Sequence, residues 1–250
     1  MADIQQHKTR PLRNRPSAAN NTNHLKNFKM LLMDAVGFLT QAHQVNNNDF
    51  WGHTSSARAS VISTCLLLEC AANCCIDGLK LSKNLQAEVD RFSPLSKFEY
   101  FIQLRSHENS FDHGIVEVAQ IKDLQKIRND YVHMKVKNAD WETAPLNQSE
   151  QLADYGNYNT LNLPKDPTVW NFDNAHTALN AVTKFFNLYF LQWLELSASD
   201  VIELLIYEGP VELPNVRGHS IAVGIYGSAF KKAEIDFGLD FAFLLKEEEL

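Results

Sequence analysis

Residues 127–135, with the sequence IRNDYVHMK, place an arginine, an asparagine and a histidine within six positions. The guanidinium of an arginine is always charged and can clamp a phosphate through two parallel hydrogen bonds. A histidine near neutral pH can take up or release a proton, and an asparagine beside it can orient the ring or donate to an oxyanion. Arg128, Asn129 and His133 therefore suit cleavage of a phosphodiester by a neighbouring 2′-hydroxyl, with no metal ion and no cofactor. The alternative is an ordinary polar helix end.

The spacing of these residues limits how one helix can use them. Asn129 and His133 are four positions apart and share a helix face, whereas Arg128 lies about 140° away from His133 at about 100° per residue. Stacking along one straight helix therefore does not bring Arg128 to His133. The two side chains could meet if the helix is distorted, or if two copies of it pack across a dimer axis.

Glu69 is a carboxylate inside the apolar stretch LLLECAANCC. Burying a carboxylate is costly unless it is paired, so Glu69 either pairs with Arg128 and orients it, or points to solvent from the polar side of its helix. Arg58, on the same predicted helix, and Lys135, two positions after His133, are candidate RNA contacts.

The four cysteines are confined to one apolar stretch, unlike the dispersed pairs of a secreted disulfide framework. Cys70 and Cys74 share a helix face, which would allow a redox or soft-metal site, but small residues packing a helix into the core is the favoured interpretation. No apolar run of bilayer length and no signal-peptide pattern is evident. We therefore expect a cytoplasmic protein with no membrane partner.

The net charge of −7 is unevenly distributed along the chain. Up to Asn138 there are 17 Lys and Arg against 13 Asp and Glu, whereas from Ala139 onward there are 6 against 17. The first part is the better candidate for contacting an anionic partner, unless the acidic second part is simply solubilising. The total charge argues against tight, non-specific binding to duplex nucleic acid.

Apolar residues that recur every three or four positions predict five helices. These helices cover about 24–43, 54–78, 93–104, 115–135 and 173–196. Thr54 or Ser55 is expected to cap the second helix and Gly78 to end it, while Ser93 followed by Pro94 is expected to begin the third.

The predicted helices suggest three parts of the chain: a flexible basic arm over 1–23, a helical bundle over 24–196 with a loop insertion near 138–171, and a C-terminal extension over 197–250. In the extension, apolar residues alternate with a period of two, which predicts a β-hairpin. The alternating residues are Ile221, Val223, Ile225, Ile235, Phe237, Leu239, Phe241 and Phe243. The predicted fold class is mainly α, with this hairpin or a small α+β extension.

Arg128, the polar residue directly after it and His133 reproduce the R-x4-6-H signature of the HEPN superfamily, the "higher eukaryotes and prokaryotes nucleotide-binding" domain, here in the form R-N-x-x-x-H. The order of helices over about 25–195 also resembles this family. Within it, ARASVISTCLLLECAANCCIDGL (57–79) is similar to the second HEPN helix, where an acidic residue among apolar ones is common.

The resemblance implies a helical bundle that dimerises, so that the motif helices of two protomers form one composite cleft. It implies a metal-independent endoribonuclease of a toxin–antitoxin, phage-defence or stress system, with RNA as substrate and an antitoxin or defence protein as possible partner. Arg128 would bind the scissile phosphate, His133 would perform acid/base chemistry and Asn129 would support either. Some toxins of the family carry a tyrosine where this chain has Lys135, so regulation through that tyrosine is in doubt.

Two other interpretations remain open from the sequence. Many HEPN members are non-catalytic and act in dimerisation or in binding nucleotides and partner proteins. The helical resemblance could also be accidental, in which case the chain is an α-helical scaffold that oligomerises.

Overall fold

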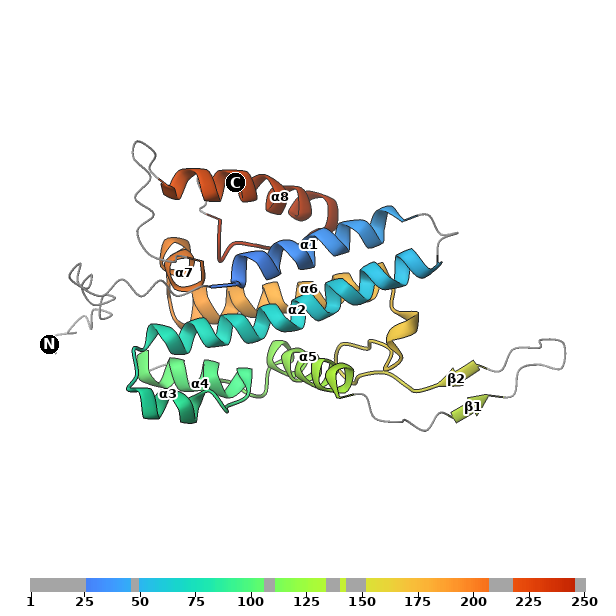
Figure 1. Cartoon of the computed structure of the whole chain (residues 1–250), viewed down its shortest axis with the longest axis horizontal. Helices are drawn as coiled ribbons and strands as arrows, with labels where there is room; N and C mark the ends of the chain where they lie inside the picture. Colours follow the sequence, from blue (N-terminus) through green and yellow to red (C-terminus); the bar gives the residue numbers. More distant parts are fainter. Residues whose placement is uncertain are drawn as a thin grey trace, which may run out of the picture.

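A computed structural model of the chain describes residues 26–45, 50–105, 111–133, 140–142, 152–206 and 218–245. The mainly α-helical fold predicted from the sequence is confirmed (Figure 1). The helices are α1 (Phe28–Gln44), α2 (Phe50–Gly78), α3 (Lys83–Val89), α4 (Pro94–Arg105), α5 (Val116–Val132), α6 (Phe172–Phe186), α7 (Ala198–Leu205) and α8 (Gly218–Phe237). They are joined by strands β1 (Asp140–Glu142) and β2 (Leu152–Asp154), the 3-10 turn η1 (Pro167–Val169) and the π-helical segment η2 (Asn187–Trp193).

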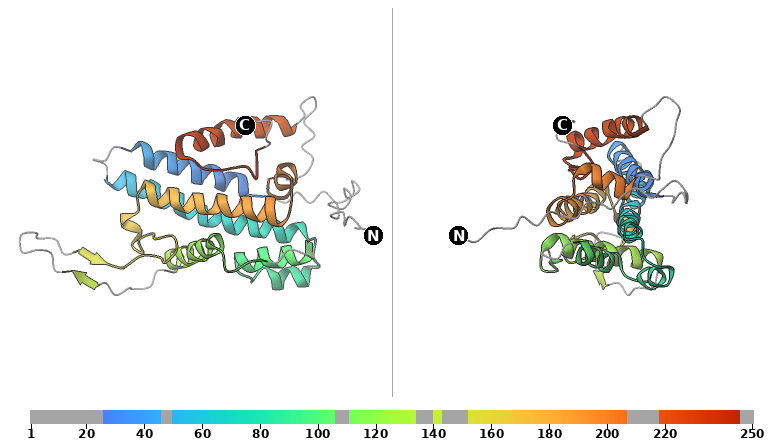
Figure 2. Two further views of the ribbon diagram at one scale, coloured as in Figure 1. Left: turned by 180° about the vertical axis from the view of Figure 1, so that it is seen from behind. Right: turned by 90° about the vertical axis from the view of Figure 1, so that its left-hand side faces the viewer.

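Helix α2 is the centre of the bundle and packs against α1, α4, α5, α6 and α7. In Figures 1 and 2, α8 lies over α1 on one side of α2 and α6, while α3, α4 and α5 lie on the opposite side. By length and composition Trp51–Gly78 could cross a membrane, which corrects the expectation that no apolar run is long enough. Within the fold, however, 67% of its most apolar window is buried, as in the core helix of a soluble protein.

The ends of two predicted helices test the capping rules. Helix α2 begins at Phe50, ahead of the predicted caps. The hydroxyls of Thr54 and Ser55 donate to the carbonyls of Trp51 and Gly52 in the preceding turn, so neither residue caps the helix. Ser93 does cap α4, since its Oγ accepts a hydrogen bond of 3.2 Å from the N–H of Ser96.

The predicted C-terminal hairpin is wrong, because residues 218–237 form α8 and the chain that follows pairs with no strand among the described residues. The alternating pattern has another cause. Phe241 and Phe243 are fully buried, with their rings against Phe230 and Phe186. The side chain of Asn187 donates to the carbonyl of Asp240 and accepts from the N–H of Phe243, which supplies hydrogen bonds that a partner strand would make.

The predicted fifth helix is present as α6 followed by η2, and its aromatic residues form much of the core. Asn171 and Asn174 cap each other at its start, in a reciprocal capping arrangement. Tyr189, in η2, donates its hydroxyl to the carbonyl of Phe98 in α4 at 2.7 Å. This buried bond fixes α4 against the end of α6.

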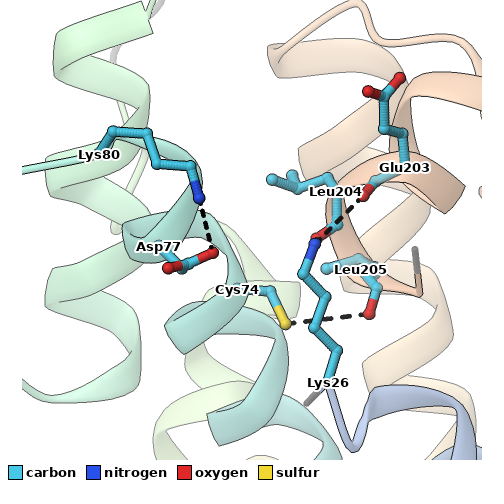
Figure 3. Close-up of polar contacts among 7 residues, drawn as sticks. All are labelled: Lys26, Cys74, Asp77, Lys80, Glu203, Leu204 and Leu205. Carbon is cyan, nitrogen blue, oxygen red and sulfur yellow. Dashed lines mark hydrogen bonds and ion pairs between the residues drawn. The ribbon is translucent and has the colours of Figure 1, made fainter. Parts of the chain in front are cut away.

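Helix α7 was not predicted, and Figure 3 shows how its last turn is held. The Nζ of Lys26 donates to the carbonyls of Glu203 and Leu204 at 3.2 and 2.9 Å. The thiol of Cys74 points to the carbonyl of Leu205 at 3.9 Å. Carbonyls in the last turn of a helix have no partner within the helix, so these contacts satisfy them and join α7 to the start of α1 and the end of α2.

The described part of the predicted loop insertion contains two short strands and a 3-10 turn. Strands β1 and β2 pair antiparallel, with Asp140 opposite Asp154. The carboxylate of Asp123 on α5 accepts from the backbone N–H groups of Thr160 and Leu161 at 2.6 and 3.0 Å, which anchors the rest of the insertion. The arm predicted over 1–23 lies outside the described residues.

All four cysteines are free thiols, and Cys65, Cys74 and Cys75 are buried. Burial raises the pKa of Cys65 to about 12 and that of Cys75 further, whereas a hydrogen bond with Cys74 lowers the pKa of the half-buried Cys70. Packing into the core, as favoured from the sequence, is therefore what three of the four thiols do.

The buried thiols predict sensitivity to alkaline pH. Above about pH 8.5, the ordinary pKa of cysteine, thiols of the unfolded chain lose protons that the folded chain retains, so the free energy of unfolding falls as pH rises. In Cys75→Ala, the fall between about pH 7.5 and about pH 9.5 should be smaller by about 1.4 kcal/mol than in the wild type. Urea unfolding at both pH values measures this, and an unchanged fall would contradict it.

Candidate functional site at the end of helix α5

Arg128 is held by two side chains on different helices. Its Nη2 lies 3.2 Å from Oε2 of Glu69 on α2, and its Nη1 donates to Oδ1 of the adjacent Asn129 at 3.1 Å. The predicted pairing of Glu69 with Arg128 is thus present in the geometry. Both partners are about one-third exposed, at 36% and 32%, so Glu69 also faces solvent in part.

The packing of α2 against α5 places this pair. The Cys65 thiol donates to the carbonyl of Leu124 at 3.5 Å, and it lies one turn before Glu69 just as Leu124 lies one turn before Arg128. Residues four apart share a helix face, so Glu69 lies on the face of α2 that Cys65 presents to α5, within reach of the long side chain of Arg128. The Nε of Arg128 is buried and has no hydrogen-bond partner among the described residues, so part of the donor capacity of the guanidinium is unused.

His133 lies just past the end of α5, which stops at Val132 and not at the predicted Lys135. Its backbone has left the helical conformation, with φ −109° and ψ 59°, and its N–H still donates to the carbonyl of Asn129 at 2.9 Å. The imidazole is exposed, and in the described part of the chain no hydrogen bond or ion pair joins it to Arg128. One chain therefore groups Arg128, Asn129 and Glu69 but leaves His133 apart.

Of the two predicted RNA contacts, Arg58 and Lys135, the structure describes only Arg58. Arg58 is half-buried in the first half of α2, eleven positions before Glu69 and so on nearly the same face. In Figure 1, α5 runs across the view in the opposite direction to α2. Lys135 lies outside the described residues.

A cavity of about 320 Å³ lies on another side of the α5 end, and sequence reasoning missed it. Its lining residues are Ile127, Asp130, Tyr131, Tyr155, Tyr158, Lys165, Asp166, Pro167, Thr168 and Trp170. Trp170 is buried, and its indole N–H donates to the carbonyl of Pro164 at 2.7 Å. The sequence signal for this cavity was the presence of three aromatic residues and the Lys165–Asp166 pair within the segment predicted to be a loop insertion.

Tyr158 connects the cavity to α5. Its hydroxyl donates to Oδ2 of Asp130 at 3.0 Å. Burial, together with this bond to a carboxylate, raises the pKa of Tyr158 well above its ordinary value. The phenol therefore stays a neutral donor at physiological pH and holds the 155–170 segment against α5.

Metal ligands and relatives add no further constraint on the site. Among the residues that the structure describes, no group of three or more His, Cys, Asp and Glu side chains is placed to hold a metal ion. Comparisons with protein-family models, curated proteins and solved structures find no match to this chain.

Proposed function

We propose that this protein is a HEPN-type endoribonuclease that acts without a metal ion and builds its active site from two copies of the chain. The carrying observation is the guanidinium of Arg128, held by Glu69 and Asn129 at one-third exposure, five positions before an exposed His133. A pre-oriented guanidinium loses little conformational entropy when it binds a phosphate, which is what a phosphodiester-cleaving site requires.

In this proposal the 2′-hydroxyl oxygen of the RNA attacks the adjacent phosphorus and the bond from phosphorus to the 5′-oxygen breaks. One His133 removes the proton of the 2′-hydroxyl or delivers one to the departing 5′-oxygen. Arg128 stabilises the negative charge that grows on the phosphate oxygens. The products are a 2′,3′-cyclic phosphate and a 5′-hydroxyl.

A second copy of the chain would complete the site. Arg128 faces α2 while His133 leaves the end of α5, so the two diverge within one chain. A two-fold axis beside the end of α5 would place the Arg128 of one copy near the His133 of the other. Arg58 and Lys135 are the proposed RNA contacts at the rim. An antitoxin or defence protein that restrains the activity is part of the same proposal.

A non-catalytic HEPN-like protein that dimerises and binds a nucleotide or a partner is the second candidate. The ion pair with Glu69 favours it, because a neutralised guanidinium attracts a phosphate less strongly. The cavity beside Asp130 and Tyr158 also favours a binding role.

Cleavage of a mixed RNA pool in the presence of EDTA tests the proposed function. Wild type should produce fragments with cyclic-phosphate ends, and His133→Ala should cut at least about 100-fold more slowly, because it removes the acid/base group. His113→Ala is the matched control, since His113 is also an exposed histidine but lies before the start of α5.

Sedimentation should show dimers for all three proteins, so that loss of activity is not loss of assembly. Absence of cleavage by a dimeric wild type, or equal rates for wild type and His133→Ala, would exclude catalysis at this site and leave the binding protein as the better candidate.

A further inference from the structure

The cavity beside α5 has flat, largely buried walls. Trp170 and Tyr158 are 1% and 3% exposed, and Tyr131 stacks on Trp170 with the ring planes 22° apart. Tyr155, which is half-buried, completes the aromatic lining. Trp170 and Tyr158 therefore form the closed back of the cavity, whereas the partly exposed rings of Tyr131 and Tyr155 can bind a planar ring by stacking, whichever nucleobase it is.

The charges around the cavity are of both signs. The lining holds the ammonium group of Lys165, which can only donate hydrogen bonds, and the carboxylates of Asp130 and Asp166, which can only accept them. A neutral ring with N–H donors on one edge and an oxygen acceptor on another can donate to a carboxylate and accept from the ammonium group.

Lys165 and Asp166 have hydrogen-bonding capacity to spare. Oδ1 of Asp166 accepts from the N–H and the hydroxyl of Thr168 at 2.9 and 2.7 Å, whereas its Oδ2 accepts from none of the described residues. The Nζ of Lys165 likewise has no hydrogen bond or ion pair within the described part of the chain. A free carboxylate oxygen and a free ammonium thus line one aromatic cavity.

Guanine matches this donor and acceptor set better than the other bases. It presents two adjacent N–H groups that a carboxylate can accept, and its O6 and N7 accept from a lysine. Adenine presents a ring acceptor beside its amino group, which a carboxylate would repel. A volume of about 320 Å³ lies within the range of roughly 300–1,000 Å³ that is usual for small-ligand pockets.

We propose that this cavity is a guanine-binding site, with Tyr131 and Tyr155 stacking on the base, Asp166 accepting from its N–H edge and Lys165 donating to its oxygen. Tyr131, which lines the cavity, is two positions from His133, so an RNA base in the cavity would lie beside the proposed cleavage site. The idea that the site selects guanosine in RNA rests on the proposed function. The idea that the site binds guanine does not.

Calorimetric titration with guanosine, adenosine and cytidine 5′-monophosphates tests the proposal. The guanosine nucleotide should bind to the wild type at least about 10-fold more tightly than the other two. Asp166→Asn, which keeps an oxygen for Thr168 but places an N–H₂ group against the base, should weaken guanosine binding about 10- to 100-fold. Asp236→Asn, at an exposed position on α8, is the matched control and should change nothing.

Each outcome is decisive for the site independently of cleavage. No binding at about 1 mM nucleotide, equal binding of all three nucleotides, or an unaffected Asp166→Asn variant overturns the guanine site. Guanosine binding by a protein that cuts no RNA supports the site while the ribonuclease proposal fails. RNA cleavage with no guanosine binding leaves the ribonuclease and removes the site.

Discussion

Replacing Phe98 by alanine is expected to lower the free energy of unfolding by about 3–5 kcal/mol. The Phe98 ring is fully buried, and its neighbours are the rings of Phe185, Phe186, Tyr189 and Phe190, at centroid distances of 4.7 to 6.4 Å. Removal of the ring loses its burial and also leaves a void that a close-packed aromatic cluster fills poorly. Urea unfolding followed by circular dichroism measures the loss.

Phe92 provides the matched control for this substitution. It precedes the same helix but is 42% exposed, with one edge-on contact to Tyr100 at 6.1 Å. Phe92→Ala should therefore cost less than about 1 kcal/mol. Comparable losses for Phe92→Ala and Phe98→Ala would contradict the aromatic cluster as the centre of stability.

The long helices were predictable from the sequence because their burial repeats with the helical period. In α1, for example, Leu32, Ala35, Val36 and Leu39 recur at steps of three or four and all are buried. The short helices α3 and α7 span only about two turns each, so they offer too few repeats to stand out. Their positions depend on contacts from elsewhere, such as Lys26 at the end of α7.

The mistaken hairpin shows where a period of two misleads. Alternate burial does not require a strand: residues 242–244 form a turn, in which the N–H groups of Leu244 and Leu245 donate to the carbonyl of Phe241. The N–H groups of Phe241 and Ala242 donate to the nearby carboxylates of Glu234 and Asp240. The bonds at Asp240 and Phe243 come from the side chain of Asn187, more than 50 positions away, and no local pattern contains that information.

One part of the candidate site was likewise predictable from the sequence, and another part was not. The pairing of Glu69 with Arg128 was predictable, because a carboxylate in an apolar stretch needs a cationic partner. The cavity was not, because it forms only when the insertion folds back onto α5. That placement depends on Asp123, in the middle of α5, and on Asp130, in its last turn. Their carboxylates accept hydrogen bonds from backbone and phenol groups that follow far along the chain.

In the proposed mechanism, replacing Arg128 by alanine is expected to reduce RNA cleavage about 1,000-fold or more, because an arginine that stabilises charge on a transferring phosphate contributes about 10³–10⁵ in rate. Stability should fall by no more than about 1 kcal/mol, since the pair with Glu69 is one-third exposed and solvent screens it. Initial rates on one defined RNA, measured with EDTA present, give the ratio.

Two further variants separate charge from orientation. Arg128→Lys keeps the charge but loses the two-pronged geometry, so it should recover only a small part of the rate. Glu69→Gln leaves the guanidinium charged but no longer fixed by an ion pair, and cleavage should fall about 10-fold while the protein remains dimeric. If Arg128→Lys cuts as fast as the wild type, Arg128 supplies only positive charge. If Arg128→Ala cuts as fast as the wild type, the guanidinium only helps α5 to pack on α2, and the scissile phosphate is bound elsewhere.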